Sequence, residues 1–120
     1  MKTKEMLKLI VNVLDNKKAN NIKIIKIDDL TILCDYFVIA DTNNVTHVKS
    51  LVDELEYELK QRDRIPNRIE KDKNSNWIVL DYQDIVVHIF HEDTRKFYNL
   101  ENIWSDGTVV SLDSLINEED

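Results

Sequence analysis

The feature that most constrains the fold is a pair of β-rich runs, 77–81 and 84–90, with almost nothing between them. Both runs are rich in valine and isoleucine, which favour strands. So short a connection predicts an antiparallel hairpin. We take Tyr82 and Gln83 as a two-residue loop. In that register the facing pairs are Asp81 with Asp84, Val79 with Val86, and Trp77 with His88.

Side chains alternate across a strand, so the predicted hairpin has two different faces. One face is aliphatic and is expected to lie in the core: Ile78, Leu80, Ile85, Val87 and Ile89. The other mixes aromatics, carboxylates and a histidine: Trp77, Val79, Asp81, Asp84, Val86, His88 and Phe90. Burial alone does not require that mixture, which is typical of a contact surface. We therefore expect function on the second face.

The rest of the chain predicts helices and strands around this hairpin. Helical spacing of apolar residues indicates three helices: 3–18 with Thr3 as N-cap, 45–62 after the capping residues of 41–44, and 95–104 with Thr94 as N-cap. Strands are predicted at 22–27, at 35–40 in the interior of the sheet, and at 67–70 on an edge. Phe97 and Trp104 are expected in the core, and Gly107 as a helix stop. The predicted fold class is mixed α+β or α/β, a mixed sheet flanked by helices.

Length and charge limit the kind of protein. The 120 residues suit one domain, which we place at 1–110, followed by an acidic tail at 111–120. The net charge is −7, and residues 101–120 carry six acids and no base, so the remainder is nearly neutral. Without a basic stripe, sequence-specific or phosphate-driven nucleic-acid binding is not expected, and a basic protein is the better partner.

The residue inventory argues against most chemistry. A single cysteine, Cys34, excludes an internal disulfide, suits a reducing cytoplasm and is expected to be buried and unreactive. His88 and His91 are three apart on a strand and point to opposite faces, so no metal site is expected. One glycine in the chain excludes nucleotide-binding glycine loops. We predict no catalytic residue, no metal and no cofactor. No stretch is long enough to span a bilayer and no secretory signal is expected.

Three motifs in order resemble the ribosomal silencing factor family, also called Iojap-like proteins. They are Asp35-Tyr-Phe-Val-Ile-Ala40, Trp77-x-Val-Leu-Asp-Tyr-x-Asp-x-Val-Val-His-x-Phe90 and Arg95-x-Phe-Tyr-x-Leu-Glu-x-x-Trp104. The resemblance covers about residues 3–110. This chain departs from it at Lys71 and Gln83, where glycine is usual, and the second departure bears on the hairpin turn.

The resemblance implies a fold related to nucleotidyltransferases but without catalysis. It also implies binding to large-subunit ribosomal protein number fourteen, where a bound factor would block joining of the small subunit and slow translation when nutrients fall. Active enzymes of this fold carry a Gly-Ser turn before paired metal-binding carboxylates. This chain has Leu33-Cys-Asp-Tyr-Phe37 there, with Phe37 where a second acid would be needed.

The sequence thus predicts a cytoplasmic translational repressor and not an enzyme. Its expected partner-binding residues are Trp77, Asp81, Tyr82, Asp84, His88 and Tyr98. Two alternatives remain open at this point. One is a residual magnesium-dependent nucleotidyltransferase or hydrolase that uses Asp35, Asp81 and Asp84. The other is a self-associating adaptor that forms a homodimer.

Overall fold

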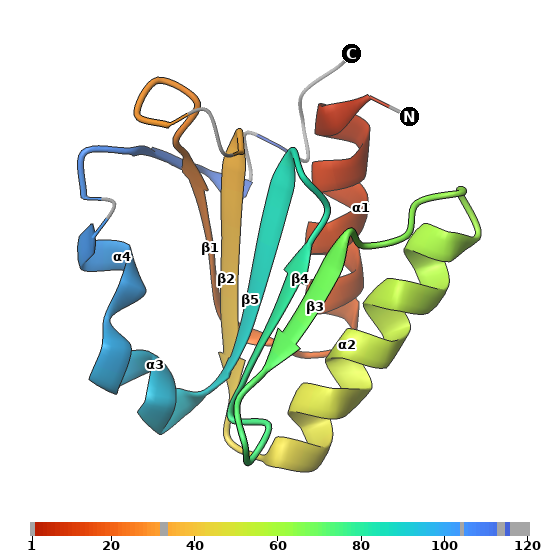
Figure 1. Ribbon diagram of the computed structural model, residues 1–120, viewed down its shortest axis with the longest axis vertical. Helices are drawn as coiled ribbons and strands as arrows, with labels where there is room; N and C mark the ends of the chain where they lie inside the picture. Colours follow the sequence, from red (N-terminus) through yellow and green to blue (C-terminus); the bar gives the residue numbers. More distant parts are fainter. Residues whose placement is uncertain (1, 32–33, 104, 113–114, 116–120) are drawn as a thin grey trace.

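The computed structural model describes residues 2–31, 34–103, 105–112 and 115 of the chain. Helices and strands alternate through the molecule much as the apolar patterns predict (Figure 1). The helices are α1 (Thr3–Asn16), α2 (Val45–Lys60), α3 (Glu92–Tyr98) and α4 (Leu100–Ile103). The strands are β1 (Asn20–Lys26), β2 (Tyr36–Thr42), β3 (Arg68–Lys71), β4 (Trp77–Asp81), β5 (Ile85–His91) and β6 (Thr108–Val110). The predicted mixed α+β class is confirmed.

A six-stranded mixed sheet forms the centre of the molecule, with the strand order β3-β4-β5-β2-β1-β6. β2 and β5 are parallel, from Tyr36 opposite Ile85 to Thr42 opposite His91. The other neighbouring strands are antiparallel. β2 lies between β5 and β1, and all its residues except the half-buried Phe37 are buried. The predicted interior position of this strand and the predicted edge position of β3 are both confirmed.

The helices form layers on the two faces of the sheet (Figure 1). α1 and α2 cover the aliphatic face, where Ile78, Leu80, Ile85, Val87 and Ile89 are each at most 1% exposed. Full burial of such a side chain stabilises the fold by roughly 1.5–3 kcal/mol. α3 and α4 lie on the opposite face, over a smaller apolar cluster that includes Ile25, Ile39 and Phe90. The predicted core face of the hairpin is confirmed.

The β4–β5 hairpin has a three-residue loop, and the predicted two-residue register is wrong. The observed pairs are Asp81 with Val86, Val79 with His88, and Trp77 with Phe90. A slip of two residues preserves the alternation of side chains, so the strand residues keep their predicted faces. Asp84, which was predicted on the mixed face, instead lies in the loop. The loop differs because only Gln83 adopts a left-handed conformation, with φ of 80°. The N–H of Asp84 donates to the carbonyl of Tyr82 (3.1 Å), which closes a γ-turn around Gln83.

The predicted capping of the first two helices is correct for one and wrong for the other. In α2 the Asn44 side chain accepts a hydrogen bond from the backbone N–H of His47 (3.1 Å), as a polar N-cap should. In α1 the N-cap is Lys2, without a side-chain bond. Thr3 instead donates from Oγ1 to Asp84 Oδ2 (2.8 Å), which ties the start of α1 to the hairpin loop.

The last predicted helix is two short helices separated by Asn99, which has a left-handed φ of 46°. Thr94 is not the cap, because α3 begins at Glu92 and the His91 Nδ1 accepts from the Asp93 N–H (3.2 Å). The predicted core position of Phe97 is also wrong. Its side chain is 82% exposed, and the buried residue of α3 is Arg95. Trp104 lies outside the described residues.

A short sixth strand, which the sequence analysis missed, pairs with β1. Gly107 precedes it, and a Cβ on Gly107 would lie 2.5 Å from Ile25 Cγ2. The glycine therefore allows the backbone to approach β1 closely and does not act as a helix stop. Beyond β6, Leu115 is 2% exposed and packs in the main core cluster.

Candidate partner-binding surface

The mixed face of the hairpin carries a groove of about 240 Å³. Apolar and charged side chains from four strands and the β1–β2 connection line it: Ile27, Thr31, Cys34, Phe37, Arg68, Glu70, Val79, Asp81, Val86 and His88. Arg68 lies on β3, where its Nε is 3.2 Å from Glu70 Oε1. The groove thus combines apolar area with surface charges of both signs, as protein contact sites do.

Three aromatic residues form a continuous exposed surface beside this groove. The Tyr98 ring lies between the other two, 4.7 Å from the Trp77 ring and 5.1 Å from the Phe97 ring between centroids. Phe97 is 82% exposed, Tyr98 is 50% exposed and Trp77 is half-buried. We call these three residues the aromatic surface. A connected group of exposed aromatics is unusual on a monomer and marks an interaction site.

Trp77 is fixed from below by Phe90 and His88. Its ring stacks on Phe90 with the centroids 4.9 Å apart, and its indole Nε1–H donates to His88 Nδ1 (3.1 Å). His88 is 6% exposed, and burial lowers the pKa of its imidazole from the ordinary 6.5 to about 4. The imidazole is therefore neutral at pH 7. His88 was predicted to contact a partner directly, but it lies beneath the aromatic surface and supports Trp77.

The predicted site residues of the hairpin loop lie elsewhere. Tyr82 is 2% exposed and packs in the main core cluster, so it offers almost no side-chain area to a partner. Asp81 lines the groove, but its Oδ1 also accepts from the Gln83 N–H (2.8 Å), a local turn interaction. The structure thus brings Trp77, Asp81, His88 and Tyr98 to the mixed face and leaves Tyr82 away from it.

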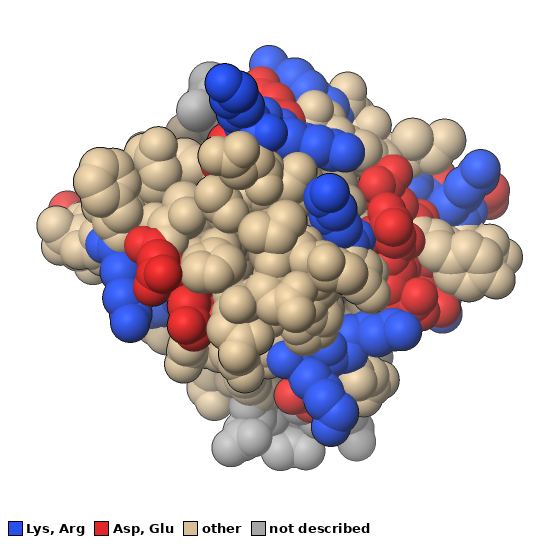
Figure 2. Space-filling model, turned by 90° about the horizontal axis from the view of Figure 1, so that it is seen from below, with Lys and Arg blue, Asp and Glu red and all other residues tan. Residues whose placement is uncertain are grey.

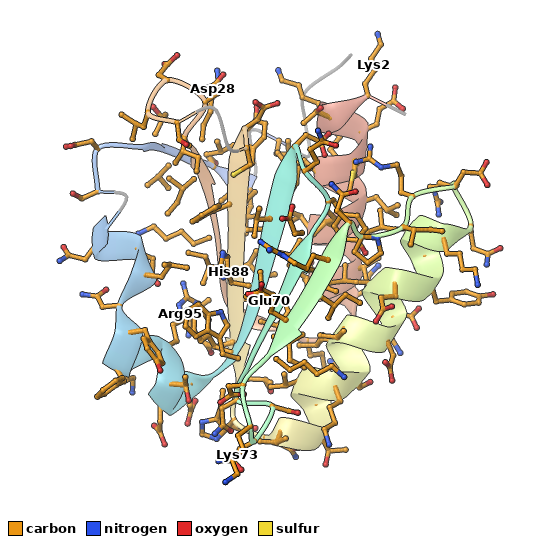
Figure 3. The ribbon with its side chains drawn as sticks, viewed as in Figure 1. Lys2, Asp28, Glu70, Lys73, His88 and Arg95 are labelled. Atoms are coloured by element: carbon orange, nitrogen blue, oxygen red, sulfur yellow. The ribbon has the colours of Figure 1, made fainter. Side chains whose placement is uncertain are left out.

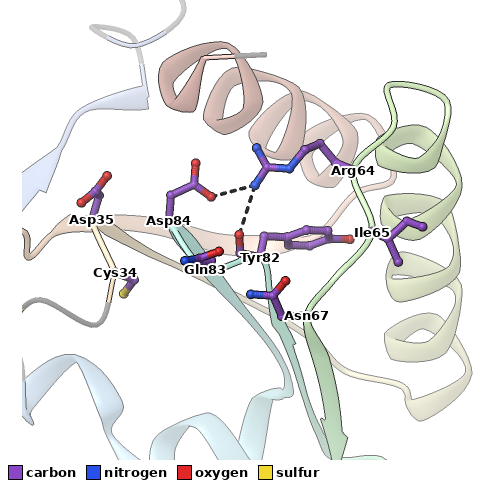
Figure 4. A pocket seen from close by; sticks show the side chains of 8 residues that line it. All are labelled: Cys34, Asp35, Arg64, Ile65, Asn67, Tyr82, Gln83 and Asp84. Carbon is purple, nitrogen blue, oxygen red and sulfur yellow. Dashed lines mark hydrogen bonds and ion pairs between the residues drawn. The ribbon is translucent and has the colours of Figure 1, made fainter.

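Asp84 belongs to a second, polar pocket of about 600 Å³ at the end of the hairpin (Figure 4). Arg64 lies over it, and its Nη2 donates to Asp84 Oδ1 (2.9 Å) and to the carbonyl of Tyr82 (3.1 Å). Together with the hydroxyl of Thr3, this arginine already occupies the Asp84 carboxylate. The pocket is lined by Cys34, Asp35, Arg64, Ile65, Asn67, Tyr82, Gln83 and Asp84.

This arrangement does not favour the nucleotidyltransferase alternative. That reaction needs Asp35, Asp81 and Asp84 to converge on metal ions. Asp35 and Asp84 line the polar pocket, whereas Asp81 lines the groove. Within the described part of the chain, no group of three or more His, Cys, Asp or Glu side chains is placed to hold a metal ion.

Cys34 lies between the two cavities and is 5% exposed. Burial, followed by the negative charges of Asp81, Asp35 and Asp84, raises the pKa of its thiol from 9.0 to about 11. A thiol that stays protonated is a poor nucleophile. The predicted buried position of Cys34 is confirmed.

A buried ionic network holds α3 against the sheet, and the sequence analysis missed it. Arg95 lies between α3 and the strands (Figure 3). Its Nη1 donates to Asp41 Oδ2 (2.9 Å) and to the carbonyl of Asn21 (2.6 Å), and its Nε donates to Glu101 Oε1 (3.4 Å). The one signal in the sequence for this network was an arginine on the side of the helix that faces the sheet. A search for periodic apolar residues does not detect an arginine.

Charged side chains are unevenly distributed at one end of the molecule. Figure 2 shows the end that faces down in Figure 1, where a broad uncharged area is bordered by lysines, arginines and acids. Depletion of charge at the centre with charge at the border is the arrangement of protein interfaces. No helix among the described residues has the length and apolar character to cross a membrane.

Comparisons with known proteins agree with one family over the whole chain. Residues 1–120 match the family described as "Ribosomal silencing factor during starvation". Ribosomal silencing factor RsfS of Halalkalibacterium halodurans is 32% identical over 117 residues, which cover 98% of this chain and all of that protein. A crystal structure of a protein from Bacillus halodurans is 31% identical, with a TM-score of 0.80 over 91% of this chain and 99% of that one.

A more distant relative has a name that concerns the ribosome directly. The mouse protein "Mitochondrial assembly of ribosomal large subunit protein 1" is 27% identical over 100 residues, which cover 81% of this chain and 44% of that protein. The bacterial relative is matched over its full length and the solved structure shares the fold. The chain belongs to the family of ribosomal silencing factors.

Proposed function

We propose that this protein represses translation by binding the large ribosomal subunit at its protein number fourteen and blocking the joining of the small subunit. The observation that carries this proposal is the family match over residues 1–120, whose description names ribosome silencing during starvation. The name of the mouse relative also points to the large subunit. The protein would act in the cytoplasm without a cofactor, slowing translation under nutrient limitation.

The aromatic surface and the adjoining groove are the part of the molecule that we assign to this contact. Trp77 and Tyr98 supply large aromatic side chains, and burial of these side chains against a partner would contribute to the binding free energy. Asp81, which lines the groove, supplies negative charge for basic side chains of the ribosomal protein. Asp84 would contribute indirectly, since its carboxylate is bound by Arg64 and Thr3 in the polar pocket. Tyr82 and His88 would contribute indirectly, since each is at most 6% exposed: His88 holds Trp77, and Tyr82 fixes the hairpin loop. Phe97, which is 82% exposed, joins this set.

The proposed mechanism requires occupancy and no chemistry. Two subunits cannot join while a folded domain of 14.2 kDa covers part of the joining surface of one of them. The extent of repression then follows from the concentration of free protein relative to its dissociation constant. Because the protein and the small subunit would compete for overlapping area, an excess of small subunits should weaken the block.

Gradient centrifugation with separated ribosomal subunits tests the proposal. The wild-type protein should move with large subunits, not with small ones, and should reduce the fraction of joined ribosomes. Trp77→Ala should abolish both effects. The control is Tyr57→Ala, which removes a 59% exposed aromatic from α2, outside the aromatic surface, and should change neither. Wild-type protein that stays at the top of the gradient with large subunits present would refute the proposal.

A further inference from the structure

α3 carries two of the three residues of the aromatic surface but has almost no hydrophobic anchor of its own. All seven residues of α3 are described, and Arg95 is the one that is buried. Phe97 and Tyr98 follow it on the exposed side. A helix of this length has little intrinsic stability in water, so contacts with the sheet must hold it in place.

Besides the ring contact between Tyr98 and Trp77, the polar contacts of α3 with the sheet converge on the Arg95 guanidinium. The Arg95 and Asp41 side chains are 10% and 4% exposed, and their charged atoms are 2.9 Å apart. Asp41 lies on β2 and Asn21 on β1, so the one arginine joins α3 to two strands through atoms far apart in sequence. The fork geometry of a guanidinium fixes direction as well as distance.

Further bonds extend this attachment into a network. Glu101 joins Arg95 from α4, across the left-handed residue Asn99. Asn21 donates from Nδ2 to both Asp41 oxygens (3.3 and 3.4 Å), which orients the carboxylate towards the arginine. The pair is thus satisfied on several sides, as buried charges must be.

We propose that Arg95 is a positioning residue that holds the aromatic surface in its binding geometry through Asp41. The proposal rests on the proposed function and adds a residue that does not itself touch the partner. Arg95 sets the orientation of α3, and α3 places Tyr98 against Trp77 and turns Phe97 outward. Without the ion pair, α3 would spend part of its time away from the sheet. The affinity for the large subunit would then fall in proportion to the fraction of molecules in which α3 is docked.

The test uses the full-length chain with both charges of the Arg95–Asp41 pair removed, R95M/D41N, so that neither member of this pair is left as a buried charge without the other. Hydrogen exchange should show faster exchange across 92–98 than in wild type, with little change in β2 and β5. Wild-type protection across 92–98 in this variant would overturn the proposal without any reference to the ribosome.

Binding to purified large subunits supplies the second readout. R95M/D41N should bind about tenfold more weakly than wild type if the docked state of α3 falls to about a tenth. In a Phe97→Ala, Tyr98→Ala background the same pair of changes should have almost no further effect, because the groups through which Arg95 acts are absent. Additive losses would overturn the positioning role, since they would mean that Arg95 acts by another route.

The two proposals fail in different ways. Wild-type protein that does not bind large subunits refutes the proposed function, and the exchange experiment still decides whether Arg95 holds α3. Wild-type protein that binds, together with R95M/D41N that binds equally well, refutes the positioning role alone. Arg95→Lys adds a check, because an ammonium cannot reproduce the fork and should restore only part of the affinity.

Discussion

Trp77 holds His88 in one tautomer, because its indole N–H donates to His88 Nδ1 at 3.1 Å. A neutral imidazole that accepts at Nδ1 carries its proton on Nε2. Within the described part of the chain, His88 Nε2 is buried without a hydrogen-bond partner. The indole bond is thus what fixes the ring that supports the aromatic surface.

Loss of this donor should destabilise the protein. Trp77→Phe keeps an aromatic ring over Phe90 but leaves His88 Nδ1 buried without a donor, which should cost about 1–3 kcal/mol of the free energy of unfolding. Urea denaturation measures the change. Phe97→Leu, at an exposed position, is the matched control and should stay within about 0.5 kcal/mol of wild type. Equal stability of Trp77→Phe and wild type would show that the bond contributes nothing.

His88 should make stability fall in mild acid. Burial lowers the pKa in the folded state from 6.5 to about 4, so between these values the unfolded chain binds a proton that the folded chain does not. Stability from this group is therefore full above about pH 6.5 and is lost as the pH falls towards 4, by about 3 kcal/mol. Denaturation of wild type and His88→Gln at pH 7 and pH 4.5 isolates the contribution. Parallel pH dependence in the two proteins would contradict the burial of a neutral imidazole.

Gln83→Gly should stabilise the hairpin. A side chain at a φ of 80° costs about 1–3 kcal/mol, and glycine removes this strain at an entropic cost of about 0.5–1 kcal/mol in the unfolded chain. We expect a net gain of about 1 kcal/mol, read as a higher thermal midpoint. Gln83→Ala is the control and should give no gain, since alanine has the same conformational penalty. A glycine variant less stable than wild type would mean that the Gln83 side chain makes a compensating contact.

Gly107→Ala should detach β6 from β1. The added Cβ would lie 2.5 Å from Ile25 Cγ2, too close for ordinary contact, and overpacking of this kind costs about 1–3 kcal/mol. Hydrogen exchange should become faster in 108–110 than elsewhere in the sheet. Ser105→Ala, at an exposed position two residues earlier, should leave the exchange unchanged. Unaltered protection of β6 in Gly107→Ala would show that the close approach is not required.

Phe97→Ala should separate stability from binding. The side chain is 82% exposed, so its removal should change the free energy of unfolding by less than about 0.5 kcal/mol. Affinity for large ribosomal subunits should fall by more than 1 kcal/mol, the usual loss at an aromatic hot spot. Tyr57→Ala again serves as the control for general loss of exposed aromatic area. A variant with lower stability and unchanged binding would reverse the assignment and place Phe97 in the fold.

The sequence predicted those parts of the fold that depend on alternation. Ile78 and Leu80 are in the core as expected, because period-two patterning survives a register error of two residues. The register could not be read from the apolar pattern, because it depends on the backbone angle of Gln83, the left-handed residue of the loop. The sequence showed only that Gln83 stands where glycine is usual. β6 was missed because three residues are too short for a periodic signal.

The sequence identified two aromatic residues of the candidate surface but not the way in which they are held in place. Trp77 and Tyr98 were selected for their chemistry and are in contact with one another. Tyr82 was selected for the same reason and is buried, because its backbone continues the pairing with Ile85 and its side chain therefore falls on the same face as Ile78 and Leu80. Arg95 was not singled out at all. A buried ion pair between residues 54 apart has no local sequence signature, since each residue taken alone appears to be a surface charge.

The single parallel pairing in the sheet also constrains how the protein is made. β2 cannot pair with β5 until the ribosome has synthesised α2, β3, β4 and β5. The chain must first lose the entropy of closing this long loop, and only then do the contacts between the two strands stabilise it. Until about residue 91 has emerged, the edge of β2 that pairs with β5 is uncovered along 36–42, which includes Val38 and Ile39. The interval between synthesis of these two strands is therefore the period in which this chain is most exposed to misassembly.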